Sequence, residues 1–490
     1  MSEAEAERFD AIIIGSGQAG KPLAVDLAKA GRKTAIIEKD QVGGVCVNVG
    51  CTPTKTMVAS ARVAHLVGRA ADYGVQTGVV EIDMAAVRRR KRDIVDLFRT
   101  GNERRLENTE NLELIRGEAR FTGAQAIEVR LVQGGERLLE AETIFINAGA
   151  RPRHPDLVGL DEVEALDSTS IMELDEVPDH LIVLGGGYIA VEFGQLFRRL
   201  GAEVTIVQRR DHLLPREDTD VAEAIAEVLR EDGVRLVLGG EATRVAPTAN
   251  GGVELTVDET STAGGSDSES ADHADASAPT TAVTTKISGS HLLVAVGRLP
   301  NTERLGLESI GVDVDRRGNV IVDERLETNV TGVFALGDVN GGPAFTHIAY
   351  DDYRIVRDNL LGDGGATTEG RFVPYTVFID PELGRVGITE REARQREIDY
   401  RVAKMPMSHV ARALETDETR GFMKVLVDAG SGAILGCAIL GIQGGELATM
   451  IQIAMMGKLH YRELKEATFS HPTLAESFNN LFLSLAPPQD

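Results

Sequence analysis

The sequence predicts an α/β protein with two Rossmann-like dinucleotide-binding domains and an α+β C-terminal domain. Three observations predict this fold class. A strand, a glycine-rich turn and a helix follow one another near the N-terminus, and the same order recurs near residue 185. From about Arg371 onward the pattern changes to short strands followed by helices. The 490 residues are also too many for a single hydrophobic core, so several domains are expected.

The first nucleotide motif begins with the apolar run Phe9–Ile14, which is typical of a buried strand. A glycine turn and a helix-like stretch follow, and the next strand, Thr34–Ile37, ends in Glu38. An acid at this distance from the turn can bind an adenosine ribose hydroxyl. The glycines that shape this turn are Gly15, Gly17 and Gly20.

The second motif repeats this order with the strand His180–Leu184, a turn with Gly185, Gly187 and Ala190, and the strand Glu203–Val207. Ala190 still allows close packing of helix on strand. The second strand leads into Gln208, Arg209 and Arg210, with no carboxylate to repel a 2′-phosphate. Arginines at this position favour NADPH over NADH. The alternative is that they are solvated arginines at a strand end.

A low-complexity insert interrupts the region after the second motif. Residues 259–285 consist mostly of Ser, Thr, Ala, Gly and Asp, with no Lys, Arg or aromatic residue. Such a composition cannot bury enough apolar surface to offset its chain entropy. We therefore expect a disordered acidic loop between strands at Val253–Val257 and His291–Val296.

The charge balance and composition exclude several function classes. Asp and Glu outnumber Lys and Arg by 76 to 52, so nucleic acid is not an expected partner. No apolar run has the length of a membrane span, and the acidic N-terminus is unlike a signal peptide. We expect a cytoplasmic protein without a membrane partner.

Two of the three cysteines, Cys46 and Cys51, lie five residues apart in the segment GGVCVNVGCTPTK. Pro53 suits the first turn of a helix, so Cys51 is placed near a helix N-terminus that stabilises a thiolate. Lys55 adds positive charge one turn later. Zinc would require further Cys or His ligands nearby, so no metal site is expected. Two buried, unlinked cysteines are the structural alternative.

A second chemical group lies near the C-terminus. His471 is followed five residues later by Glu476, which can bond one ring nitrogen and fix the tautomer. A histidine held in this way can serve as an acid–base group for thiol chemistry. Cys437 lies in an apolar strand and is expected to be packed in a core.

The cysteine segment resembles the redox-active disulfide segment of the class I pyridine nucleotide-disulfide oxidoreductases, the family of lipoamide dehydrogenase, glutathione reductase and mercuric reductase. Other markers of the family follow in order along the chain: Asn147 to Gly149, Gly185 to Glu192, Gly297 to Asn301, Gly337 with Asp338, and His471 with Glu476. The resemblance implies an FAD domain in two parts (1–150 and 291–365), an NAD(P) domain (151–290) and a dimerisation domain (366–490).

The resemblance also implies cofactor contacts. The first glycine motif would bind the FAD pyrophosphate, with Glu38 on the ribose, the backbone near Ala119 at the adenine and Asp338 on the ribityl chain. Gly149 would lie at the return strand of the FAD domain, and Gly297 in the segment that returns to it. The second glycine motif would bind NAD(P)H, with Tyr188 as a lid and Arg209 at the NADPH phosphate.

The same resemblance implies the electron path. Cys51 matches the thiol that contacts the flavin, Cys46 matches the interchange thiol, and Lys55 would pair with Glu192 beside the flavin. His471 and Glu476 would act on the disulfide of the other subunit, which implies a homodimer. Electrons would run from NADPH, or from NADH, through FAD and the Cys46–Cys51 disulfide to the acceptor.

Three functions remain open. The first is an NAD(P)H:disulfide oxidoreductase, working on a small or protein-borne disulfide or in reverse on a dithiol. The second is an Hg(II) or Cu(II) reductase, because Ala411–Leu414 and Asp417–Phe422 resemble the mercuric reductase branch, although the C-terminal cysteine pair of that branch is absent. The segment Phe469–Ser477 resembles the reactive-chlorine-resistance flavoproteins, some of which reduce copper. The third is a flavin-binding redox sensor without turnover.

Overall fold

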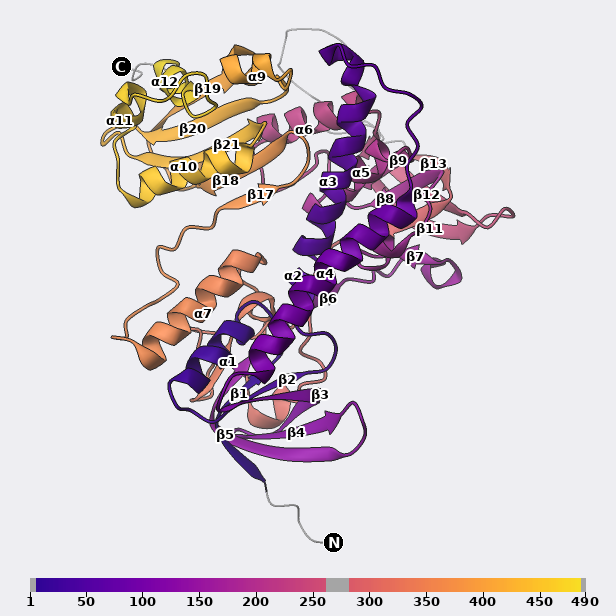
Figure 1. The fold of residues 1–490 in the computed structure, drawn as a ribbon. Helices are drawn as coiled ribbons and strands as arrows, with labels where there is room; N and C mark the ends of the chain where they lie inside the picture. The colour runs from indigo at the N-terminus through magenta and orange to yellow at the C-terminus, as the bar shows by residue number, and fades with distance from the viewer. Residues whose placement is uncertain (1–5, 261–281, 486–490) are drawn as a thin grey trace. The chain divides into compact units, whose positions relative to one another are not determined.

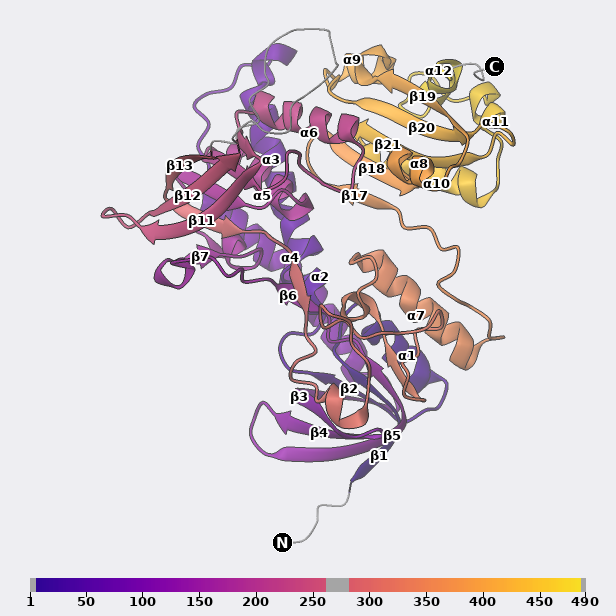
Figure 2. The same cartoon turned by 180° about the vertical axis from the view of Figure 1, so that it is seen from behind.

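A computed structural model describes residues 6–260 and 282–485 (Figures 1 and 2). The chain divides into two compact units. The first unit comprises Met1–Met57, Ala85–Arg153 and Gly297–Val373, and the second comprises Val58–Met84, His154–Val296 and Pro374–Asp490. The fold class is confirmed: both units are α/β, and the C-terminal part is α+β. The expected domain boundaries stay predictions, and residues 58–84 cluster with the second unit.

The first unit is built on a parallel sheet in which β1 lies between β2 and β5, with β3 beyond β2 and β16 beyond β5. β4 pairs antiparallel with the second half of β3 and the first half of β5. The strands span β1 (Glu7–Ile14), β2 (Thr34–Glu38), β3 (Leu112–Gly123), β4 (Ala126–Leu131), β5 (Glu136–Ile146) and β16 (Val333–Ala335).

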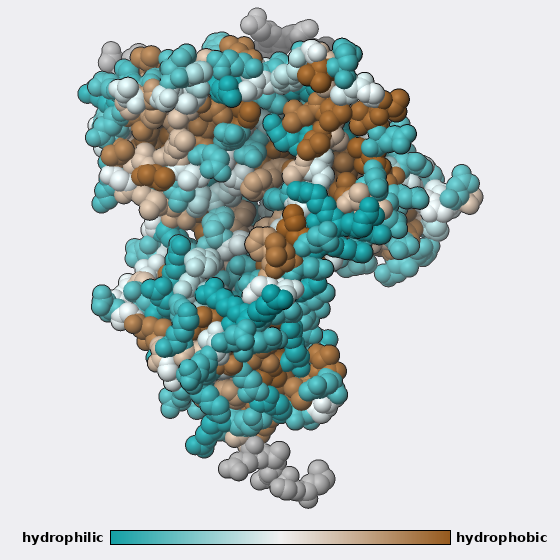
Figure 3. Space-filling model, viewed as in Figure 1, coloured by the Kyte–Doolittle hydropathy of each residue, from teal (hydrophilic) through white to brown (hydrophobic). Residues whose placement is uncertain are grey.

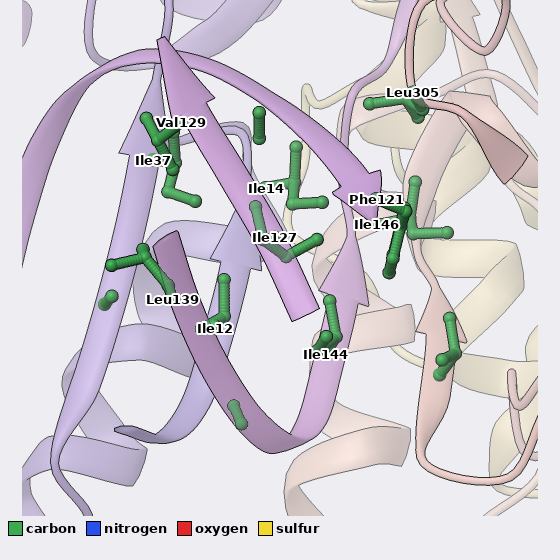
Figure 4. Close-up of a cluster of buried hydrophobic side chains, with 14 of the residues drawn as sticks. Ile12, Ile14, Ile37, Phe121, Ile127, Val129, Leu139, Ile144, Ile146 and Leu305 are labelled. Carbon is green, nitrogen blue, oxygen red and sulfur yellow. The ribbon is translucent and has the colours of Figure 1, made fainter. Parts of the chain in front are cut away.

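Both faces of this sheet are buried, which explains the unbroken apolar run of β1. Alternate residues enter two different cores: Ile13 packs with helices α1 (Gly20–Lys29) and α7 (Thr346–Leu361), and Ile12 and Ile14 pack under β3 and β4. Figure 4 shows the second core, where Ile127 and Val129 of β4 and Phe121 of β3 point toward the isoleucines of β1 and β5.

Further helices and two short strands belong to the first unit or to residues 58–84, which link its parts. They are α2 (Gly44–Asn48), α3 (Cys51–Gly68), η1 (Ala70–Tyr73), α4 (Met84–Glu107), the antiparallel pair β6 (Ala150–Pro152) and β15 (Arg298–Pro300), and the 3₁₀ helices η4 (Leu307–Ile310) and η5 (Gly337–Asn340). The boundary between the units falls within α3 and again at the start of α4.

The second unit contains a parallel sheet in the order β10-β9-β8-β14-β7 and an antiparallel sheet β11-β12-β13. The elements span η2 (Leu160–Glu162), β7 (Ala165–Leu166), η3 (Ser170–Glu173), β8 (His180–Leu184), α5 (Tyr188–Arg199), β9 (Glu203–Gln208), α6 (Thr219–Glu231), β10 (Arg235–Leu238), β11 (Gly240–Pro247), β12 (Val253–Thr260), β13 (Ala282–Gly289) and β14 (His291–Val294).

The predicted loop 259–285 requires a correction. β12 continues to Thr260, and β13 begins at Ala282 and pairs antiparallel with it, for example Thr256 with Lys286. The insert therefore connects two strands of a hairpin rather than leading directly to the strand at His291. The strand β13 was missed because its Thr- and Val-rich start continues the composition of the insert. Residues 261–281 lie outside the described part of the chain.

The C-terminal part of the second unit is an antiparallel sheet in the order β17-β18-β21-β20-β19, with α10 packed on β18 and β21. The elements span β17 (Tyr375–Val377), β18 (Glu382–Gly387), α8 (Glu390–Gln395), β19 (Tyr400–Pro406), η6 (Met407–His409), α9 (Ala411–Glu415), β20 (Phe422–Asp428), β21 (Ile434–Gly441), α10 (Gly444–Met456), α11 (Tyr461–Glu466) and α12 (Ser477–Leu483). Cys437 on β21 is fully buried, and burial raises the pKa of its thiol to about 12.

Hydrophilic residues cover most of the face shown in Figure 3, and apolar residues occur on it in scattered patches. Among the described helices, none combines the length and apolar composition that crossing a bilayer requires.

Candidate redox and nucleotide sites

The first glycine turn, Gly15–Gly20, joins β1 to α1 in the first unit. Gly15 has φ +102°, and a Cβ there would lie 2.3 Å from the carbonyl oxygen of Asn147. At Gly20 a Cβ would lie 2.4 Å from the carbonyl oxygen of Gly15. Only glycine fits at these positions, and α1 begins without a side-chain cap. The turn and the helix start therefore fit a pyrophosphate, as expected for FAD.

Glu38 lies at the end of β2 and is 8% exposed. Its Oε2 accepts hydrogen bonds from the backbone N–H and the hydroxyl of Ser16, at 3.0 and 2.6 Å, and its Oε1 accepts from the N–H of Asp40 at 2.9 Å. Carboxylate oxygens can accept further bonds, so the acid is held firmly beside the turn and still fits a ribose. Ser16 is a partner that the sequence did not single out.

The remaining expected FAD residues lie in the same unit. Asp338 lies in η5, directly after β16, and burial raises the pKa of its carboxyl, whereas the nearby Arg298 lowers it. Ala119 is buried on β3 opposite Val129 of β4. Gly149 and Gly297 adopt positive φ at the turns where the chain leaves and re-enters this unit.

Cys46 and Cys51 belong to two consecutive helices, α2 and α3, and α3 begins at Cys51. Neither is part of a disulfide in this structure. A hydrogen bond with Cys51 and burial raise the pKa of the Cys46 thiol far above its usual range. In the reduced pair, the thiol of Cys46 therefore favours its protonated form.

Two polar groups beside the thiols were not predicted. The hydroxyl oxygen of Thr346, at the start of α7, lies 3.3 Å from the sulfur of Cys51, and Thr346 also lowers the pKa of Cys46 by hydrogen bonding. Lys21, in the first turn of α1, is 8% exposed and lowers the pKa of Cys46 through its charge. Burial lowers the pKa of Lys21 itself to about 8.

Sequence signals for these two residues differ. Lys21 is a charged residue directly after the third glycine of an otherwise apolar helix start, a pattern that can be noticed in the sequence. Thr346 is separated from Cys51 by 295 residues, and no local pattern joins them.

The second glycine turn, Gly185–Ala190, joins β8 to α5 in the second unit. Gly185 has φ +117°, and a Cβ there would lie 2.4 Å from the carbonyl oxygen of Ala295. Gly187 precedes the helix and has open space around it, and Ala190 is fully buried. Tyr188 is the first residue of α5 and is 39% exposed. This turn also fits a nucleotide phosphate.

Gln208 is the last residue of β9 and packs against the second glycine turn. A Cβ at Gly186 would lie 2.8 Å from the side chain of Gln208. The side-chain amide of Gln208 donates to the carbonyl oxygen of His212 at 3.3 Å. Arg209 and Arg210 follow and are exposed. The strand end therefore presents two cations beside the turn.

His471 and Glu476 lie just before α12, and the His471–Pro472 peptide bond is cis. The ring nitrogen Nδ1 of His471 lies 2.9 and 3.1 Å from the two carboxylate oxygens of Glu476. The histidine side chain is 70% exposed, so its second ring nitrogen can reach a substrate. This His–Glu dyad has the geometry of a tautomer-fixing pair.

Some expected partners belong to different units. Cys46, Cys51 and Lys55 lie in the first unit, and Glu192 and the His–Glu dyad lie in the second. Glu192 is 4% exposed, and its Oε1 accepts from the backbone N–H of Phe378 at 2.8 Å. The pairing of Lys55 with Glu192 and the action of the dyad on the thiols stay predictions.

Residues 9–352 match the family described as pyridine nucleotide-disulphide oxidoreductase, and residues 373–482 match its dimerisation domain. The chain belongs to this family. Its relatives include a probable pyridine nucleotide-disulfide oxidoreductase, RclA, of Escherichia coli K12, which is 37% identical and covers 97% of this chain and 99% of its own. A mercuric reductase of Staphylococcus aureus is 34% identical, covering 96% of this chain and 81% of its own.

The dihydrolipoyl dehydrogenase of Haloferax volcanii is 33% identical and covers 95% of this chain and 94% of its own. Among solved structures, the Cu(II) complex of the HOCl-induced flavoprotein disulfide reductase RclA from Escherichia coli superposes with a TM-score of 0.85. It is 36% identical and covers 97% of this chain and 99% of that chain.

This member of the pyridine nucleotide-disulphide oxidoreductases is thus an FAD-containing NAD(P)H:disulfide oxidoreductase, which confirms the leading function predicted from the sequence. Its dimerisation domain supports a homodimer. The residues of the first unit fit FAD and those of the second fit a pyridine nucleotide, so the two predicted cofactors agree with the family.

Proposed function

We propose that this enzyme reduces a small or protein-borne disulfide with electrons from NADPH, using Cys46 as the attacking thiol, Cys51 as its partner and the His–Glu dyad as the acid–base group. The observation that carries the proposal is the environment of Cys46, a thiol that is largely buried beside Cys51. Because the hydrogen bond with Cys51 and burial raise the pKa of Cys46, the attacking thiol needs a base. His471, oriented by Glu476, provides one.

FAD, when bound, supplies the two-electron chemistry that links the nicotinamide to the dithiol. Gly15, Gly17, Gly20, Glu38 and Asp338 would hold it in the first unit. The second glycine turn would hold the nucleotide, with Tyr188 at the entrance. These residues bind and orient the cofactors, whereas the dithiol performs the exchange with the acceptor.

The exchange proceeds in two balanced steps. His471 removes the proton from Cys46, the thiolate attacks one sulfur of the acceptor, the acceptor S–S bond breaks, and His471 returns the proton to the leaving thiolate. The thiolate of Cys51 then attacks the sulfur of Cys46 in the mixed disulfide, so that the Cys46–Cys51 disulfide forms and the second acceptor thiolate leaves and takes up a proton from solvent. One acceptor disulfide becomes two thiols as the enzyme dithiol becomes a disulfide.

The dyad that acts on each Cys46–Cys51 pair is proposed to come from the other subunit of the homodimer. The match of residues 373–482 to a dimerisation domain supports this arrangement, because His471 and Glu476 lie within the matched residues. Mixing inactive Cys46→Ser and His471→Ala subunits tests it. Each hybrid dimer has one intact site and should recover up to half of the wild-type rate per dimer, and no recovery contradicts the proposal.

A preference for NADPH is proposed because Arg209 and Arg210 are exposed beside the second glycine turn, where they can contact a 2′-phosphate. Replacing Arg209 by Ala should lower kcat/KM for NADPH by about tenfold and leave that for NADH nearly unchanged. Arg8→Ala, at an exposed site in the first unit, is the matched control. Equal kcat/KM for both nucleotides in the wild type contradicts the proposal.

Reduction of Hg(II) or Cu(II) by the same dithiol is the second candidate. It is favoured by the 34% identity to a mercuric reductase and by the likeness to a structure of RclA with Cu(II). Delivery of electrons to a metal ion leaves no thiol group to be protonated, so it depends less on an acid–base group than disulfide exchange does.

An acceptor panel of lipoamide, glutathione disulfide, Hg(II) and Cu(II), with NADPH oxidation as readout, separates the two functions. We expect turnover with a disulfide that is lost in Cys46→Ser and strongly reduced in His471→Ala. Turnover with a metal ion alone, retained in His471→Ala, contradicts the disulfide function and supports the second candidate. Negligible turnover with every acceptor contradicts both and supports a redox sensor.

A further inference from the structure

Asp352 on α7 is an acid that the proposed reaction does not use, yet its side chain is 1% exposed. Its Oδ2 accepts hydrogen bonds from the backbone N–H of Gly337 at 2.8 Å and from the side-chain amide of Asn340 at 3.3 Å. Gly337 and Asn340 are the first and last residues of η5. The carboxylate of Asp352 therefore accepts hydrogen bonds from the first and the last residue of the short turn that contains Asp338.

The turn also has contacts of its own with α7 and with the end of β16. Gly337 has φ +72°, and a Cβ there would lie 3.3 Å from the Cβ of Ala349 on α7. Asn340 also donates to the carbonyl oxygen of Ala335 at 3.2 Å, which ties the turn to the end of β16. The carboxylate of Asp352 completes this arrangement, because a buried acceptor satisfies a backbone N–H that has left the strand.

Arg371 provides the charge that allows Asp352 to stay buried. Its Nη1 lies 2.6 Å from Oδ1 of Asp352, and its side chain is 16% exposed. The neighbouring Asp351 is farther away, at 3.9 Å, and is 32% exposed. Burial raises the pKa of Asp352, and Arg371 and the N–H of Gly337 oppose this rise. Without Arg371, a second buried acid beside Asp338 would favour protonation of either one.

We propose that Asp352 and Arg371 form a positioning pair that holds the Asp338 turn in the shape that retains FAD. The proposal rests on the proposed contact of Asp338 with the ribityl chain. Arg371 comes from the segment that follows α7 and precedes the last residues of the first unit. FAD retention would therefore depend on the ion pair between Arg371, in the segment after α7, and Asp352 on α7.

Substitutions at Asp352 and Arg371 distinguish the effect of their charges from the effect of their hydrogen-bond geometry. In Asp352→Asn the amide oxygen can still accept from Gly337, but the amide nitrogen then faces the guanidinium, a contact between two donors. Arg371→Gln removes the charge and leaves Asp352 intact, whereas Arg371→Lys keeps a charge. Asp351→Asn is the matched control, since it is the same substitution one residue away on a partly exposed acid that lies farther from Arg371.

The test measures FAD release from the holoenzyme by the rise in flavin fluorescence, with far-ultraviolet circular dichroism recorded on the same samples. Asp352→Asn and Arg371→Gln should release FAD at least about tenfold faster at temperatures where the ellipticity is unchanged. Arg371→Lys should lie between Arg371→Gln and the wild type, and Asp351→Asn should match the wild type.

The variant Asp338→Asn separates a failure of the positioning pair from a failure of the proposed contact between Asp338 and FAD. If Asp338→Asn releases FAD faster and neither Asp352→Asn nor Arg371→Gln does, the positioning pair is wrong and the Asp338 contact stands. If none of the three releases FAD faster, both are wrong. Release of FAD only together with loss of ellipticity also overturns the pair, because it shows a general loss of stability. Where Asp352→Asn does not fold, Arg371→Gln alone decides.

Discussion

We predict that substitutions of the two residues of the His–Glu dyad reduce the rate of disulfide reduction to very different extents. His471→Ala removes the proposed acid–base group, whereas Glu476→Gln keeps an acceptor for Nδ1–H and removes only the charge. If His471 moves the proton, its loss should lower kcat/KM for a disulfide by about 10² to 10⁴-fold, or roughly 3 to 5 kcal/mol. The expected effect of Glu476→Gln is much smaller.

The size of that smaller effect follows from exposure. The two side chains are 70% and 32% exposed, so solvent screens the ion pair that forms when the imidazole is protonated. An exposed pair contributes roughly 0.2 to 1 kcal/mol, which corresponds to at most about a fivefold change in rate. We therefore expect a ratio of at least about twentyfold between the effects of the two variants.

The assay is kcat/KM for NADPH-dependent disulfide reduction between pH 6 and 9, together with the rate at which NADPH reduces the enzyme in the absence of an acceptor. The second rate should be unchanged in both variants, because the dyad acts only on the exchange. His409→Ala, at an exposed histidine of the same C-terminal sheet region, is the control. Wild-type kcat/KM in His471→Ala refutes the acid–base role, and equal losses in both variants refute the reasoning from exposure.

Three further predictions concern other groups. Lys21→Gln removes a charge that favours the thiolate of Cys46, so alkylation of Cys46 in the reduced enzyme should be slower below about pH 8, where Lys21 is protonated, with exposed Lys29→Gln unchanged; a wild-type alkylation rate contradicts this. Thr346→Val should slow disulfide exchange by up to about tenfold, since one hydrogen bond to the thiols is lost; wild-type exchange rates argue against it. Burial lowers the pKa of His65 to about 4. Below about pH 6.5 the unfolded chain therefore binds a proton that the folded protein excludes, and stability falls toward pH 4. The Tm of His65→Gln should fall less than that of the wild type over this range. If the Tm of both proteins falls equally with pH, His65 is not the group responsible.

Much of the fold was predictable because its signals are local. The strand His180–Leu184 agrees with the prediction residue for residue, and α3 begins at Cys51 as Pro53 indicates. In both glycine turns, a Cβ at the first glycine would collide with a backbone carbonyl, which explains why the motif could be recognised in the sequence. Apolar runs and turn residues report the backbone shape of their own neighbourhood, so they can be interpreted without a tertiary structure.

Where prediction failed, a long-range contact or an ambiguous composition was responsible. The first half of β13 lies within the predicted insert 259–285, because its pairing with β12 cannot be seen in a Thr-rich segment. The sequence argument named Lys55, one turn after Cys51, and did not name Lys21, whose charge lowers the pKa of Cys46 from another helix. A spacing argument finds neighbours along one helix and misses those that another helix brings.

Sequence patterns alone were sufficient to locate the two glycine turns, the two close cysteines, the His–Glu pair and the family to which the chain belongs. Each is a short pattern whose chemistry depends on residues close together in the chain. Only the tertiary structure decided which groups tune them: Thr346 at Cys51, Ser16 at Glu38, and Asp352 with Arg371 at the turn of Asp338. These contacts join residues that folding alone brings together, and burial strengthens those of Glu38 and Asp352 by excluding water.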